Sequence, residues 1–119
     1  MDWVVVSIEA FDAEFSSLPH DVQTALLAKA RLLEHFGPQL GRPHVDTLKD
    51  SKHANMKELR FDAADGVWRA AFAFDTQRQA VILVAGDKSG GSEKRFYRSL
   101  IATADKRFDD YLAQQKRGA

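Results

Sequence analysis

The chain has 119 residues, with 17 basic and 17 acidic side chains and no cysteine. This length fits a single domain, and a hydrophobic fraction of 45% excludes an intrinsically disordered chain. The lack of cysteine excludes thiol nucleophiles, iron–sulfur clusters and cysteine-based zinc sites. No apolar run approaches the ~18 residues that a membrane span needs, so we expect a cytoplasmic protein without membrane contact.

Charge is distributed unevenly along the chain. The net charge is −4 over residues 1–41, +3 over residues 42–98 and +1 over residues 99–119. Because the overall net charge is 0, the chain has no general attraction for a polyanion, and any such binding depends on the cationic middle segment. The same charge count fits a solvated sheet edge equally well.

The N-terminal part predicts a strand followed by two helices. Residues 3–8 (WVVVSI) are rich in β-branched side chains, as strands are. Phe11, Phe15 and Leu18 recur at the spacing of one face of a short helix. Residues 20–36 have the apolar periodicity of a longer amphipathic helix, which a Gly-Pro pair ends.

The remainder predicts a loop, three strands and a final helix. The predicted segments are a loop at 39–54, strands at 56–61, 67–74 and 80–85, a helix at 93–112 and a flexible tail at 113–119. The expected fold is α+β, with one domain over residues 1–112. Its antiparallel sheet would comprise the N-terminal strand and a three-stranded meander, with one face covered by helices and the other open.

Two arginines fall in the middle of predicted strands. Arg60 alternates with Leu59 and Phe61, so it faces the opposite side of the sheet. Arg69 likewise points away from the aromatic side chains of its strand. An arginine between apolar neighbours indicates either a packed ion pair, with Glu58 as the candidate partner, or an anion site on an exposed face.

Further cations cluster near the ends of the predicted strands and at the start of the last helix. They are Lys57, Lys88, Lys94, Arg95 and Arg98, with Tyr97 among them. Cations beside aromatic rings suit single-stranded nucleic acid, because phosphates pair with the cations and bases stack on the rings.

Histidines are the remaining candidates for proton transfer. His44 and His53 lie in the predicted loop, and either could act as a general acid or base because histidine titrates near neutrality. A structural role is the more common one for such a residue. The spacing of the four histidines predicts no metal site, and no glycine-rich phosphate loop or nucleophile elbow is present.

Four segments in order resemble the RelE/HigB superfamily of toxins, in particular its phage-derived HigB-like branch. They are Leu40-Gly41-Arg42-Pro43, the run from Val45 to Ser51 (VDTLKDS), Glu58-Leu59-Arg60-Phe61 and the run from Trp68 to Phe74 (WRAAFAF). The resemblance extends over residues 3–112 and is most specific between residues 40 and 85.

This resemblance implies a RelE-like fold and the toxin half of a type II toxin–antitoxin module. Many such toxins are metal-independent endoribonucleases that cleave mRNA, commonly on the ribosome, and an antitoxin, often with a helix-turn-helix domain, neutralises them. It implies no cofactor. Residue by residue, it implies that Arg69 and Arg60 stabilise phosphate charge, with Lys88, Tyr97 or His53 moving protons.

Two features depart from the branch and keep other functions open. The chain is neutral, whereas ribosome-dependent toxins of this kind are usually basic, and DKSGGSEKRFYRS lacks the branch's K-K-x-x-x-x-P segment. The alternative is a non-catalytic member of the fold, either a ParE-like toxin directed at gyrase or a decayed toxin that binds a protein partner. A domain of unrelated function on a similar scaffold is a third reading.

Overall fold

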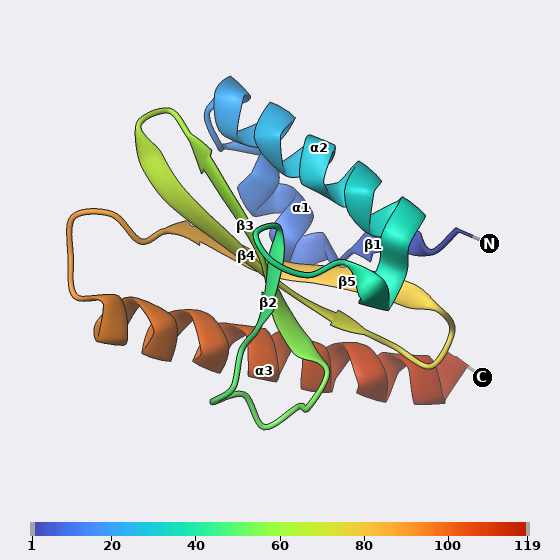
Figure 1. The fold of residues 1–119 in the computed structure, drawn as a ribbon. Helices are drawn as coiled ribbons and strands as arrows, with labels where there is room; N and C mark the ends of the chain where they lie inside the picture. The colour runs from blue at the N-terminus through green and yellow to red at the C-terminus, as the bar shows by residue number, and fades with distance from the viewer. Residues whose placement is uncertain (1, 119) are drawn as a thin grey trace.

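A computed structural model describes residues 2–118 of the chain. Its sheet lies between helices α1 and α2 on one side and helix α3 on the other (Figure 1). The elements in chain order are β1 (Val4–Ser7), α1 (Glu9–Ser16), α2 (His20–Phe36), a short 3-10 helix (Gly37–Gln39), β2 (Val45–Thr47), β3 (Met56–Ala63), β4 (Gly66–Phe74), β5 (Gln79–Asp87) and α3 (Glu93–Gly118).

The α+β fold is confirmed, but the sheet is mixed. Its five strands have the order β1-β5-β4-β3-β2. The predicted meander of β3, β4 and β5 is antiparallel, whereas β1 pairs with β5 in parallel. The expectation of a wholly antiparallel sheet is therefore wrong for β1. The partner of β1 lies far along the chain, and a strand's own residues do not encode the direction of such a partner.

Strand β2 lies inside the segment predicted to be a loop. It has only three residues and pairs with β3 from Val45↔Leu59 to Thr47↔Lys57. So short a strand shows too little alternation to be recognised among polar neighbours.

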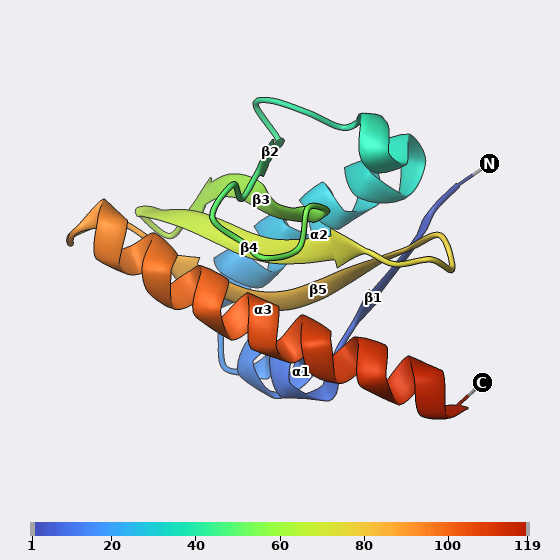
Figure 2. The ribbon, with the colours of Figure 1, turned by 90° about the horizontal axis from the view of Figure 1, so that it is seen from below.

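Both faces of the sheet are covered, so the expectation of one open face is wrong. One core joins the sheet to α1 and α2 through side chains such as Phe11, Leu26 and Phe72. The other core packs Leu100, Ala104 and further α3 residues against the opposite face. Figure 2 shows α3 crossing this second face along most of its length.

Helix α3 continues past the predicted end at Leu112 to Gly118. The extra turn is tied to the hairpin between β4 and β5. Gln115 Nε2 donates to Asp75 Oδ2 and to the hydroxyl of Tyr111, both at 3.0 Å. This tertiary contact compensates for the loss of apolar periodicity that suggested a tail.

Arg107 on α3 contacts both a bulge in β5 and helix α1. Ala71 pairs with Val84 but the next residue, Phe72, pairs with Ile82, which leaves Leu83 as the extra residue of a bulge. Arg107 Nη1 on α3 donates to the carbonyl oxygen of Leu83 at 2.8 Å. The same guanidinium makes a bidentate contact with Glu14 on α1, at 2.8 and 2.6 Å.

A glycine is required where α2 ends. Gly37 has φ +56°, and a Cβ there would lie 2.3 Å from the Trp3 ring. Gly41 offers a contrast in the following loop, because a Cβ there would meet no atom within 4 Å. Gly37 is therefore needed for its backbone conformation and for space, whereas Gly41 is not.

We expect Gly37→Ala to lower the free energy of unfolding by about 1–3 kcal/mol or more, because it adds backbone strain and a steric clash. Gly41→Ala is the matched control and should change it by less than about 0.5 kcal/mol. Urea denaturation of both variants measures the difference. Equal free energies of unfolding for the two variants would show that packing against Trp3 does not require glycine at position 37.

The bidentate contact between Glu14 and Arg107 predicts a pH-dependent contribution to stability. The hydrogen bond from Arg107 lowers the pKa of Glu14. The stabilisation is therefore complete above the unfolded-state pKa of about 4.3 and is lost as the pH falls through the lower folded-state pKa. Because Glu14 is 47% exposed, we expect Glu14→Gln to cost at most about 1 kcal/mol at pH 7. The difference from the wild type should shrink towards pH 3, as measured by urea titrations at several pH values.

Candidate functional site

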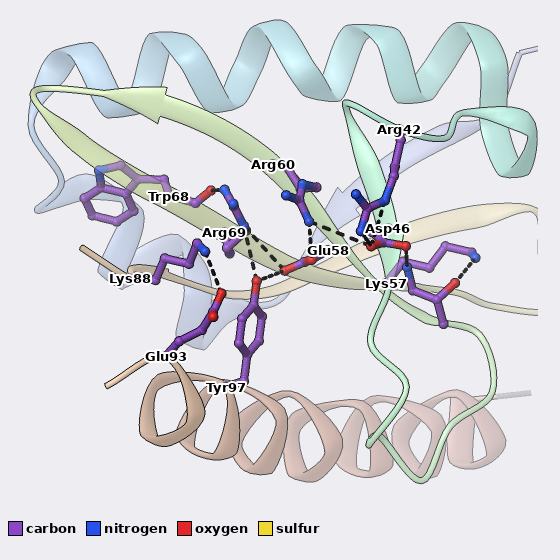
Figure 3. A network of polar contacts seen from close by, with 11 residues as sticks. Arg42, Asp46, Lys57, Glu58, Arg60, Trp68, Arg69, Lys88, Glu93 and Tyr97 are labelled. Carbon is purple, nitrogen blue, oxygen red and sulfur yellow. Dashed lines mark hydrogen bonds and ion pairs between the residues drawn. The ribbon is translucent and has the colours of Figure 1, made fainter. Parts of the chain in front are cut away.

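A buried carboxylate, that of Glu58, lies at the centre of the polar network in Figure 3. Glu58 is 3% exposed. Its Oε1 accepts a hydrogen bond from the Tyr97 hydroxyl at 2.8 Å, and its Oε2 accepts one from Arg60 Nη1 at 3.1 Å. Arg69 Nε lies 3.7 Å from Oε1. The packed ion pair with Glu58 that the sequence left open is therefore present.

Strand register explains why these side chains meet. Arg60 on β3 and Arg69 on β4 are direct cross-strand partners. Like charges opposite one another on one face destabilise a sheet. Glu58 lies two residues before Arg60, so it shares that face and supplies the counter-charge. Tyr97 reaches the same carboxylate from the first turns of α3.

Arg69 occupies the interior of the network rather than its surface. Its side chain is 7% exposed. Nη1 donates to the Trp68 carbonyl at 2.9 Å and Nε donates to the Tyr97 hydroxyl at 3.3 Å. These contacts place Arg69 beside Glu58 and Tyr97, and its predicted contact with phosphate stays a prediction.

The Tyr97 hydroxyl is held as a neutral phenol. Burial raises its pKa first, and the hydrogen bond to the Glu58 carboxylate raises the pKa further, while Arg69 partly opposes both effects. At neutral pH Tyr97 is therefore a proton donor to Glu58 and not a phenolate.

A groove of about 740 Å³ opens beside this network, between α3 and the loop that carries β2. Tyr97 and Glu58 both line it. Its basic lining residues are Arg42, Lys49, Arg60, Lys94 and Arg98, and its acidic ones are Asp46, Asp50, Glu58 and Glu93. The groove is thus a charged surface with an excess of one cation, next to a carboxylate–phenol pair.

The predicted cations of α3 divide between the groove and the outside. Lys94 and Arg98 line the groove, whereas Arg95 is exposed and does not. Lys88 forms an ion pair with Glu93, with Nζ 2.7 Å from Oε1. That contact lowers the pKa of Glu93, so Lys88 acts on the groove through a lining carboxylate.

Two predicted site residues make no hydrogen bond or ion pair with Glu58, although Figure 3 draws Lys57 at the far end of the polar network, linked through Thr47 to Asp46. Lys57 has the parity of Leu59 and pairs with Phe72, whose side chain belongs to the core against α1 and α2. Lys57 therefore faces the opposite side of the sheet from Glu58, and its Nζ donates to Thr47 Oγ1 at 3.2 Å. His53 Nε2 lies 2.8 Å from Asp109 Oδ1, about 18 Å along α3 from Tyr97 at 1.5 Å per residue.

Sequence reasoning missed Asp46 and Arg42 as site residues. Arg42 Nη2 lies 2.6 Å from Asp46 Oδ2, and Arg60 Nη1 lies 3.8 Å from the same oxygen. The backbone N–H of Thr47 and the guanidinium of Arg42 lower the pKa of Asp46. Recognition of β2 would have identified this carboxylate, since Asp46 pairs with Glu58 in the ladder.

The described residues 2–118 contain no group of three or more His, Cys, Asp or Glu side chains that could hold a metal ion. Over the same range, no helix combines the length and apolar character needed to cross a membrane.

Comparison with known families identifies the chain. The model of the family "Phage derived protein Gp49-like" matches residues 13–109. The chain belongs to the Gp49-like family. It is 41% identical over 114 residues to the Mycobacterium tuberculosis (strain ATCC 25618 / H37Rv) protein named "Putative toxin HigB3", in an alignment that covers 96% of this chain and 97% of that protein. It is 40% identical over 108 residues to "Putative toxin HigB2" of the same strain, in an alignment that covers 90% of this chain and 53% of that protein.

The fold of this Gp49-like protein matches a solved toxin structure. A double arginine-to-alanine mutant of the E. coli toxin RelE, in the free state, superposes with a TM-score of 0.62 at 13% identity, covering 86% of this chain and 96% of that one. The fold match and the 41% identity to the protein named HigB3 together confirm the resemblance to the RelE/HigB superfamily, so the chain is a homologue of toxins of HigB/RelE type.

We expect Arg69→Met to lower the free energy of unfolding by on the order of 3 kcal/mol, because it removes a cation from a buried carboxylate. In a Glu58→Gln background the same substitution should cost less, with an interaction energy of about 1–3 kcal/mol. Denaturant unfolding of the wild type, both single variants and the double variant gives this value. Additive effects would show that the two side chains are not coupled.

Proposed function

We propose that this Gp49-like protein is the toxin of a type II toxin–antitoxin module and cleaves mRNA in the cytoplasm, on the ribosome and without a metal ion. The observation that carries the proposal is the cationic groove beside the Glu58–Tyr97 hydrogen bond. Similarity to the proteins named HigB3 and HigB2 supports the toxin role and an antitoxin partner. We propose that this partner is of the helix-turn-helix type.

The proposed reaction uses the nucleophile that RNA itself provides. A 2′-hydroxyl attacks the adjacent phosphorus, the bond to the 5′ oxygen breaks, and a 2′,3′-cyclic phosphate and a 5′-hydroxyl form. Cations stabilise the additional negative charge of the transition state. Arg60 and Arg98, which line the groove, are suited to that role.

Glu58 and Tyr97 form a proton relay in this proposal. The Tyr97 oxygen takes the proton of the 2′-hydroxyl as the phenol gives its own proton to Glu58 Oε1, along a hydrogen bond that already exists. Lys94 lines the groove and forms no ion pair with any of residues 2–118. In this proposal it donates a proton to the leaving 5′ oxygen.

A second candidate is a non-catalytic toxin or a decayed one, acting on gyrase or on another protein. The observation that favours it is the burial of Arg69 at 7% exposure within a network that satisfies it. A groove whose cations exceed its acids by only one is also compatible with a protein ligand.

Induced expression in bacteria tests the two candidates. We expect the wild type to arrest growth and to create new mRNA 5′ ends inside coding regions. Tyr97→Phe keeps the ring but removes the transferable proton, and should lower cleavage by about 10²-fold or more. Arg98→Ala should also reduce cleavage, while Lys106→Ala, an exposed α3 residue outside the groove, should cleave as the wild type does.

Other outcomes would redirect the assignment. Growth arrest with intact mRNA would indicate a target such as gyrase, and absence of arrest would indicate a binding partner. Cleavage of purified RNA that stops when EDTA is added would contradict the metal-independent mechanism. Cleavage that requires added ribosomes would support action on the ribosome.

A further inference from the structure

A second hollow lies at the edge of β3, beyond the end of β2. The ladder between β2 and β3 ends at Val45↔Leu59, and one more bond follows, from the Arg60 N–H to the His44 carbonyl at 2.8 Å. Past that point α2 faces this edge across a hollow of about 470 Å³. Its polar lining residues are Lys29, Arg60, Asp62 and Arg69.

Two basic side chains meet next to this hollow. Lys29 Nζ on α2 lies 2.7 Å from the ring nitrogen Nδ1 of His44. An ammonium group is a donor only, so Lys29 is the donor in this contact. Among residues 2–118, no carboxylate lies within ion-pair distance of either group. A pair of adjacent bases without a counter-charge is the arrangement that an anion would complete.

Arg60 connects the hollow with the groove. Arg60 lines both the hollow and the groove, and its backbone N–H donates a hydrogen bond to the His44 carbonyl. An anion at Lys29 and His44 would therefore be a near neighbour of an anion at Arg60. The polyanion that presents closely spaced phosphates and can bend around a strand edge is a single-stranded nucleic acid.

We propose that Lys29 and His44 form a second phosphate subsite, which extends the RNA path from the groove, past Arg60 and over the edge of β3 to α2. This inference rests on the proposed function, since it takes the groove to be the place where RNA binds. Among residues 2–118, Asp62 is the only acidic side chain that lines the hollow. Lys29 and Arg60 are its accessible cations, because Arg69 is 7% exposed and bonded within the network. The subsite contributes affinity for a longer strand and takes no part in the chemical step.

Binding of uncleavable RNA tests the subsite. We would measure fluorescence anisotropy of a dinucleotide and an octanucleotide, both fully 2′-O-methylated so that the nucleophile is absent. Lys29→Gln should weaken binding of the octanucleotide several-fold and reduce the slope of log K against log salt by about 0.7. It should leave the dinucleotide affinity unchanged. Lys106→Gln, at a position outside both hollows, is the control for loss of one lysine charge. Thermal melting checks that each variant is folded.

The outcomes separate this inference from the proposed function. If Lys29→Gln binds the octanucleotide with unchanged affinity and salt slope while Arg98→Ala weakens it, the subsite is wrong and the groove assignment stands. If the wild type binds neither oligonucleotide, the subsite is wrong, and the growth and cleavage assays decide the proposed function separately. If Lys29→Gln leaves RNA binding intact but weakens binding of the antitoxin, the surface belongs to the antitoxin and the subsite is again wrong. His44→Gln should reproduce the length-dependent loss, and a variant with no such loss would remove His44 from the subsite.

Discussion

The structure of the site depends on one constraint, the cost of burying the Glu58 carboxylate. A buried carboxylate needs opposite charge and hydrogen-bond donors. Here Arg60, Arg69 and Tyr97 supply them from β3, β4 and α3. Because the three donors come from three elements, the start of α3 is held against the sheet at the point where the groove begins. No buried polar side-chain atom among the described residues lacks a partner.

The same constraint divides the two arginines between different tasks. Arg69 is enclosed, with its guanidinium committed to Tyr97 and to a backbone carbonyl. Arg60 is about a quarter exposed and remains open to two hollows. A cation that is held by Glu58 yet reaches solvent is pre-organised for an anionic ligand, since less of its conformational freedom has to be lost on binding.

Local charge matters more than net charge in this Gp49-like protein. The chain is neutral, and a cationic domain would attract RNA over a longer range. Here seven of the 17 basic side chains line the groove or the hollow beside β3. Five of the six acidic side chains of residues 1–41 lie on α1 and α2. Attraction by such a surface is short-ranged and sensitive to salt.

The sequence by itself determined the helices, the meander and the faces on which Arg60 and Arg69 lie, because the 3.6-residue and two-residue periods are local properties. It also placed the chain in its superfamily, through the motifs between residues 40 and 85. It could not determine the parallel pairing of β1, the three-residue β2 or the final turn of α3, which depend on partners distant in the chain. Nor could it show which arginine is buried. Strand parity assigns a side chain to a face, and it already separates Lys57 from Glu58. Only the position of α3 over the other face decides that Arg69 is enclosed, that Arg60 stays accessible and that His53 lies beside Asp109.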